Sequence, residues 1–289
     1  MANLKEIRSR ITSVASTMQI TSAMKMVSAA KLKRAQNAIV QMRPYAEKLQ
    51  EILANVSSSL DASEGLYSVQ RDVKNVLVVA ITSNRGLCGA FNSSIIKEVN
   101  RLTEDHKDAN VKVLSLGKKA ADLLKKDERY FTDGFGDEPY TIQNELTFAD
   151  VSEVAQKLMD QFADGDWDKV IIAYNRFKNA GVQLVTVEQF LPVLPPSGDN
   201  QSNLDYIFEP SKEFIVEEII PKSLKVQLYK SLLDSRAAEH GARMTAMHKA
   251  TENASDLKSD LTLHYNKARQ AAITGEILEI VGGAEALNG

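Results

Sequence analysis

The sequence predicts an α/β fold with long helices, in which an antiparallel coiled coil of the N- and C-terminal helices carries an inserted α/β domain. Three observations favour this fold class. Both ends of the 289-residue chain show helical apolar periodicity. The middle alternates short aliphatic runs with amphipathic stretches, as parallel α/β sheets do. Aromatic residues make up only 6% of the chain, which favours aliphatic and small-residue helix seams over a β-sandwich.

Residues 1–60 are predicted to form one long helix. Apolar residues recur there at alternating intervals of three and four, the spacing of a left-handed coiled-coil seam. The first stretch comprises Leu4, Ile7, Ile11, Val14 and Met18. After a phase shift through Ile20, Met24 and Val27, the same spacing continues from Leu32 to Leu60.

Residues 73–191 are predicted to form the α/β domain. Short aliphatic runs bounded by polar residues indicate buried strands. They are Asn75–Thr82, Val111–Leu116, Lys169–Tyr174 and, as a candidate edge strand, Val182–Phe190. Helices are expected from Asn92, a candidate cap, to about His106, from about Lys118, and over Thr147–Phe162. Strands separated by helices predict a mainly parallel sheet.

Residues 192–221 hold five of the seven prolines and are predicted to form an irregular connection with at most a short helix. Residues 222–289 then form a second long helix whose seam is rich in small residues, which allow close helix approach. Two long helices with apolar stripes most simply bury them against each other, as an antiparallel pair.

Charge is uneven along the chain although the net charge is only −3, which excludes a globally basic nucleic-acid-binding protein. Residues 1–50 contain nine Lys/Arg and two acids, whereas residues 125–170 contain twelve acids and five Lys/Arg. Distinct surfaces for distinct partners and simple solvated helix faces both fit this asymmetry.

The motifs predict no catalytic, cofactor-binding or metal-binding residue. The loop Ser83–Asn92 follows a strand and opens a helix, but it lacks both glycine-rich phosphate-binding spacings. Cys88 is the single cysteine, and no histidine can be placed beside it as a base, so a structural role is predicted. No zinc-ligand spacing, targeting segment or membrane span is visible.

The C-terminal stretch has an apolar stripe that one neighbouring helix can cover on one side only. The stripe consists of Ile273, Ile277, Ile280, Ala284 and Leu287. A helix that is apolar over most of its circumference requires enclosure. The sequence therefore favours a partner that surrounds this end, with a homodimer contact or a fold back onto the domain as alternatives.

At these residues the chain resembles the gamma subunit of F-type ATP synthases, and the resemblance covers essentially the whole chain. The strongest match is a C-terminal pattern made by Ile273, Thr274, Glu276, Glu279, Gly283, Ala284 and Ala286. Further matches, in order, are the N-terminal helix sequence, RPY at 43–45, RGLCGAFN at 85–92, YIFEP at 206–210, ARMTAM at 242–247 and YNKARQ at 265–270.

The resemblance implies a coiled-coil shaft with a Rossmann-like α/β foot. The shaft inserts into a ring of alpha and beta subunits, and the foot contacts the epsilon subunit and the membrane c ring. ATP chemistry belongs to the beta subunits, so this chain is expected to be non-catalytic, without cofactor, and to couple ion-driven rotation of the c ring to the catalytic sites. A peripheral place on the cytoplasmic face of the bacterial inner membrane is implied, without nucleic-acid binding or direct bilayer insertion.

Partner contacts are carried over from the family to individual residues. The shaft candidates are Met24, Lys25, Lys33, Arg34, Arg269, Gln270, Thr274 and Glu276, and Tyr206 is the candidate for the epsilon contact. Two other classes of protein remain as alternatives. An enzyme with a coiled-coil appendage would need a catalytic constellation, and none is visible in the sequence. A basic coiled-coil tethering protein would bind nucleic acid or membrane with a steep salt dependence and no subunit specificity.

Overall fold

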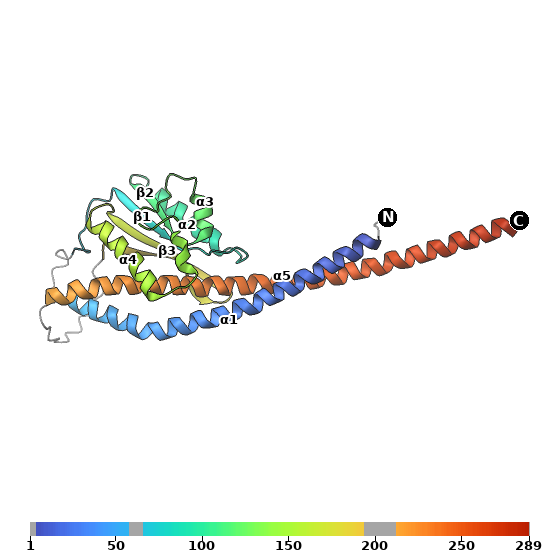
Figure 1. Ribbon diagram of the computed structural model, residues 1–289, viewed down its shortest axis with the longest axis horizontal. Coiled ribbons are helices and arrows are strands. Elements are labelled where there is room, and N and C mark those ends of the chain that lie inside the picture. The colour runs from blue at the N-terminus through green and yellow to red at the C-terminus, as the bar shows by residue number, and fades with distance from the viewer. Residues whose placement is uncertain (1–3, 58–65, 194–211, 289) are drawn as a thin grey trace. The chain divides into compact units, whose positions relative to one another are not determined.

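The computed structural model describes residues 4–57, 66–193 and 212–288 (Figure 1). The chain divides into two compact units, one of residues 1–28 and 244–289 and one of residues 29–243. Helices α1 (Leu4–Ser57) and α5 (Lys212–Asn288) each contribute to both units. The two long terminal helices and the central sheet confirm the predicted fold class.

The unit of residues 29–243 is built on a four-stranded sheet in the order β2-β1-β3-β4. Strands β1 (Asn75–Ala80), β2 (Asn110–Ser115) and β3 (Lys169–Asn179) are parallel, and β4 (Val182–Leu191) pairs antiparallel with β3. The central strand β1 is buried at all but its first residue, which explains its continuous aliphatic sequence. The prediction of a mainly parallel sheet with an edge strand over residues 182–190 is confirmed.

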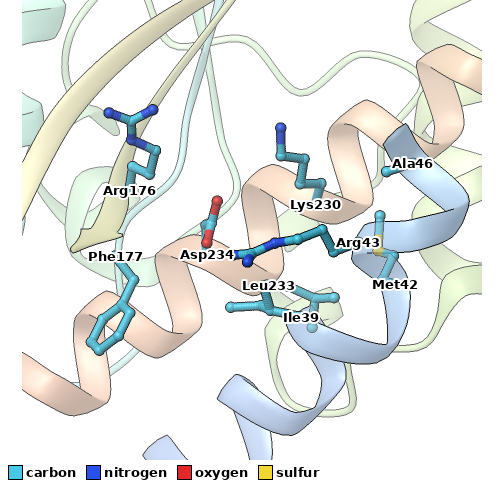
Figure 2. A pocket seen from close by; sticks show the side chains of 9 residues that line it. All are labelled: Ile39, Met42, Arg43, Ala46, Arg176, Phe177, Lys230, Leu233 and Asp234. Carbon is cyan, nitrogen blue, oxygen red and sulfur yellow. The ribbon is translucent and has the colours of Figure 1, made fainter. Parts of the chain in front are cut away.

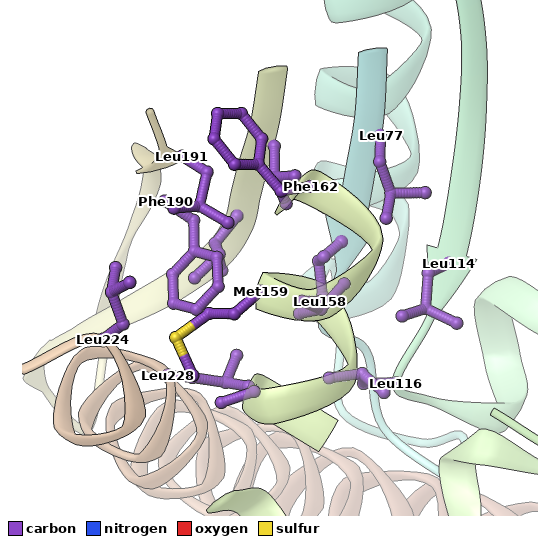
Figure 3. Close-up of a cluster of buried hydrophobic side chains, with 14 of the residues drawn as sticks. Leu77, Leu114, Leu116, Leu158, Met159, Phe162, Phe190, Leu191, Leu224 and Leu228 are labelled. Atoms are coloured by element: carbon purple, nitrogen blue, oxygen red, sulfur yellow. The ribbon is translucent and has the colours of Figure 1, made fainter. Parts of the chain in front are cut away.

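Helices cover both faces of this sheet. Helices α2 (Phe91–Asp105) and α3 (Lys118–Leu124) pack on the face that carries Val76 and Val78. Helix α4 (Phe148–Ala163) and part of α5 pack on the other face, against Leu77 and Val79 (Figure 3). Successive side chains of β1 point to opposite faces of the sheet, so this strand contributes residues to both hydrophobic cores. A short 3₁₀ helix, Pro139–Gln143, precedes α4.

Helices α1 and α5 run antiparallel in each unit (Figure 1). In the unit of residues 29–243, Ala46 and Leu49 of α1 form an apolar cluster with Val226 of α5. In the other unit, Thr21 meets Thr251 and Lys25 meets His248. As the residue number increases along α1, that of its partner on α5 decreases, which confirms the predicted antiparallel pair.

Two local predictions are wrong. Helix α5 begins at Lys212, not near Lys222, and continues through Pro221, so the predicted irregular connection is too long at its C-terminal end. Proline removes one helical hydrogen bond, but the turns around it are held by the Lys222–Glu218 ion pair and by buried Ile220. Asn92 does not cap α2; its side chain holds the preceding loop instead.

Candidate functional site on the terminal helices

The unit of residues 1–28 and 244–289 consists of the paired ends of α1 and α5. The hydroxyl oxygens of Thr21 and Thr251 lie 2.8 Å apart across the pair. The ammonium of Lys25 lies 3.3 Å from Nδ1 of His248, whose Nε2 lies 3.5 Å from a carboxylate oxygen of Glu252. These polar contacts define the register of the two helices, in which Thr21 lies opposite Thr251 and Lys25 opposite His248.

The C-terminal part of α5 extends past the start of α1 (Figure 1). Continuing the antiparallel register places Leu4, the first residue of α1, opposite Ala268. Beyond that point Ile273, Ile277 and Ile280 are 48%, 55% and 71% exposed, and Leu278 and Val281 are also exposed. The sequence-based expectation was that the N-terminal helix covers one side of this stripe, but the described part of α1 does not cover Ile273, Ile277 or Ile280. We call these five residues the apolar end of α5.

The predicted contact residues are solvent-accessible where the structure describes them. Arg269, Gln270, Thr274 and Glu276 are exposed on α5 beside the apolar end. Met24 and Lys25 are half-buried in the helix pair, whereas Lys33 and Arg34 are exposed on the part of α1 that belongs to the other unit. Tyr206 lies outside the described residues.

These residues do not converge on one site. Lys25 lies beside His248, and 21 residues separate His248 from Arg269 along α5. At a rise of 1.5 Å per residue, the two groups are about 30 Å apart along the helix. Such an arrangement suits an extended binding surface, whereas a catalytic site requires its groups within hydrogen-bond reach of one another.

The other place to seek a site is the carboxyl edge of the sheet, where α/β domains bind ligands. The chain's own side chains occupy it. The amide of Gln143 donates to the carbonyl oxygens of Thr82 and Leu116. Asn84 accepts from the backbone N–H of Lys118, and Thr82 accepts from that of Ala120, so the first turn of α3 is already satisfied.

The loop between β1 and α2 is tied to α5. The Arg243 guanidinium donates to the carbonyl oxygens of Arg85 and Gly86, at 2.7 and 3.2 Å, and forms a buried 2.5 Å ion pair with Glu239. The loop thus directs carbonyl oxygens toward the guanidinium of Arg243. A phosphate-binding loop instead directs backbone N–H groups toward an anion. Asn92 bonds both Ser83 and Cys88 in the same loop.

Cys88 is buried, and burial raises the pKa of its thiol, with Ser83 and Arg243 opposing the rise. A raised pKa reduces the thiolate fraction, which fits the structural role predicted from the sequence. The Arg243–Glu239 ion pair was not predicted from the sequence. The sequence feature that could have indicated this pair is an acidic and a basic residue four positions apart within the small-residue seam of the C-terminal helix.

The described ranges contain no group of three or more His, Cys, Asp or Glu side chains placed to hold a metal ion. Among the described residues, no helix combines the length and the hydropathy needed to span a membrane.

The chain, with its α/β domain inserted between two long paired helices, is similar to known proteins along nearly its whole length. A family model described as ATP synthase matches residues 3–287. The ATP synthase gamma chain of Flavobacterium johnsoniae is 60% identical over the full length of both chains, and that of Cytophaga hutchinsonii is 50% identical, again over both full lengths. The chain therefore belongs to the gamma-chain family of ATP synthases, the central-stalk subunits of these complexes.

Solved structures agree with this assignment. A chain from the central stalk and c ring of the Tetrahymena thermophila mitochondrial ATP synthase is 26% identical, with a TM-score of 0.57, covering 80% of this chain and 99% of that one. A chain of the Euglena gracilis mitochondrial ATP synthase reaches a TM-score of 0.68 at 23% identity, covering 98% and 94%, and this likeness supports the fold.

Proposed function

We propose that this chain is the rotating shaft of an F-type ATP synthase. It couples ion-driven rotation of the membrane c ring to conformational changes at catalytic sites on the beta subunits, and it is not itself catalytic. The observation that carries the proposal is the apolar end of α5, which extends beyond α1 with its isoleucines half or more exposed. Exposed apolar clusters on a helix require a partner.

The proposed partners are the alpha and beta subunits around the terminal helices, with the epsilon subunit and the c ring at the α/β domain. Met24, Lys25, Lys33, Arg34, Arg269, Gln270, Thr274 and Glu276 are proposed to contact the alpha and beta subunits, and Tyr206 the epsilon subunit. The complex places the chain peripherally on the cytoplasmic face of the bacterial inner membrane.

The physical basis of coupling is a different set of contacts at each rotation angle. A rotor shifts the population of a catalytic-site conformation only through contacts that differ between the states. A helix pair that carries different side chains around its circumference presents a different face to each beta subunit as it turns. The occupied carboxyl edge of the sheet also supports a role without nucleotide binding by this chain.

Reconstitution tests this proposal. The full chain is combined with alpha, beta and epsilon subunits and the c ring in vesicles, and ATP hydrolysis, ATP-driven ion pumping and rotation of a bead on the α/β domain are recorded. We expect pumping and one-way rotation in the complex, and no ATPase activity of the chain alone. Failure to assemble with alpha and beta subunits, or ATP turnover by the isolated chain, contradicts it.

A further inference from the structure

A cavity of about 300 Å³ lies between α1, β3 and α5, entirely within the unit of residues 29–243. Each element contributes one basic side chain to its lining: Arg43 from α1, Arg176 from β3 and Lys230 from α5 (Figure 2). Asp234, one turn along α5 from Lys230, lies at its centre. The rest of the lining is largely apolar and includes Ile39 and Leu233.

The charges of this cavity do not balance. Three cations line it, and Asp234, only 8% exposed, is its single carboxylate. Glu188 lies near Asp234 but is hydrogen-bonded to the hydroxyl of Tyr174 at 2.6 Å. Even with Glu188 counted, positive charge remains in excess. Burial raises the pKa of Asp234, while Lys230, Arg176 and Arg43 oppose that rise.

We propose that this cavity binds a small phosphate ester, whose phosphoryl group lies among Arg43, Arg176 and Lys230 and whose organic part contacts the apolar lining. Guanidinium groups match the oxygen geometry of a phosphoryl group with paired hydrogen bonds, and a lysine adds a compact charge. Arg43 and Arg176 are exposed residues and Lys230 is half-buried, and the side chain of Arg43 extends toward Asp234 (Figure 2).

The apolar lining favours an ester over free inorganic phosphate. A cavity of about 300 Å³ is at the small end of ligand pockets, and a phosphate ion fills only part of it. An apolar group attached to the phosphate covers Ile39 and Leu233, and this burial adds affinity.

Calorimetric titration of the purified full chain tests the site with two probes, phenyl phosphate and inorganic phosphate. We expect saturable binding of phenyl phosphate with a single site per chain, and binding of inorganic phosphate that is about tenfold weaker because the phenyl ring loses contact with water. Equal affinity for the two probes overturns the ester assignment. Absence of saturable phenyl phosphate binding overturns the site.

Paired variants test the residues in opposite directions. Arg176→Gln removes a cation and should weaken phenyl phosphate binding about fivefold, whereas Asp234→Asn removes the competing carboxylate and should tighten it by a similar factor. Arg101→Gln makes the same charge change on α2, across the sheet from the cavity, and should leave affinity unchanged. Circular dichroism confirms folding, and Arg43→Gln replaces Arg176→Gln if that variant does not fold. Weakening by both Arg176→Gln and Asp234→Asn, or equal weakening by Arg101→Gln, contradicts the proposal.

Discussion

Gly117 lies two residues after the end of β2, where two backbone segments come into close approach. A Cβ atom built there would lie 2.1 Å from the carbonyl oxygen of Thr82, far inside van der Waals contact. The backbone of Gly117 is extended, so the requirement for glycine is one of space and not of conformation. Gln143 bonds the same carbonyl oxygen, which leaves Thr82 little freedom to move.

Gly117→Ala should therefore destabilise the α/β domain by about 2–3 kcal/mol, the cost of forced overpacking. Denaturant unfolding of the full chain measures the change. Gly86→Ala is the matched control: the nearest atom to its added Cβ is the end of the Lys119 side chain at 4.0 Å. A Gly117→Ala variant as stable as Gly86→Ala contradicts the close approach.

His240 is a second residue whose behaviour follows from its surroundings. It is buried on α5, and burial lowers the pKa of its imidazole from 6.5 to about 3, with Arg243, Lys31 and Arg236 acting in the same direction. The unfolded state therefore binds a proton between these two pH values that the folded state does not. The resulting stability is complete above pH 6.5 and is lost as the pH falls toward 3.

Replacing His240 with Gln should flatten the dependence of stability on pH over that range. A single group of this kind contributes a slope of up to about 1.4 kcal/mol per pH unit. The free energy of unfolding, measured by urea titration at several pH values from 4 to 7, reports the slope. His264→Gln changes an exposed histidine on the same helix and serves as the control. Equal slopes in the wild type and His240→Gln would show that His240 is not held neutral.

At the scale of elements, periodicity was sufficient to predict the helices and strands that are long or strongly patterned. The strand at residues 75–80 and the α4 helix were visible because burial imposes an aliphatic run on one and a 3.6-residue stripe on the other. The start of α5 could not be predicted from the prolines, because Pro221 lies inside the helix, next to buried Ile220 and the Lys222–Glu218 ion pair. The loop held by Arg243 was missed because its partners are 157 and 158 residues away in sequence.

Some parts of the candidate sites could be predicted from sequence periodicity, and others could not. The apolar end of α5 was predictable from its spacing, because periodicity reports which side chains share a helix face. The cavity beside Asp234 was not, since its basic residues come from three elements and only tertiary packing brings them together. The proposed subunit contacts came from family resemblance, because exposed polar residues carry no periodic signal of their own.

The register of α1 against α5 can be tested by a designed disulfide. Thr21→Cys with Thr251→Cys should crosslink readily under mild oxidation, since the two hydroxyl oxygens lie 2.8 Å apart. Mobility on a non-reducing gel detects the product. Thr21→Cys with Ser259→Cys is the control, because Ser259 lies about 12 Å further along α5. Faster crosslinking of the control pair contradicts the antiparallel register.

At the scale of the whole molecule, the apolar end of α5 and the polar residues beside it offer different kinds of interaction to a surrounding partner. Apolar burial contributes about 25 cal/mol per Å² at any rotation angle, so it holds a shaft without choosing an orientation. Hydrogen bonds weaken steeply with distance and angle, so polar groups such as Arg269, Gln270 and Glu276 distinguish one orientation from another. We therefore expect the apolar end to act as a bearing and the polar residues to transmit torque.

Two variants of the reconstituted complex separate these roles. Truncation after Glu276 removes four of the five residues of the apolar end. It should weaken assembly but preserve one-way rotation in the complexes that form, because Arg269, Gln270 and Glu276 remain. Arg269→Ala with Gln270→Ala should leave the fold and assembly intact but lower ATP-driven ion pumping per ATP hydrolysed. Asn266→Ala with Lys267→Ala, a neighbouring exposed pair on α5, controls for simple loss of polar surface. Rotation in random directions by the truncated shaft, together with normal pumping by the Arg269 and Gln270 variant, would mean that the roles are reversed: the apolar end would then select orientation and the polar residues would not.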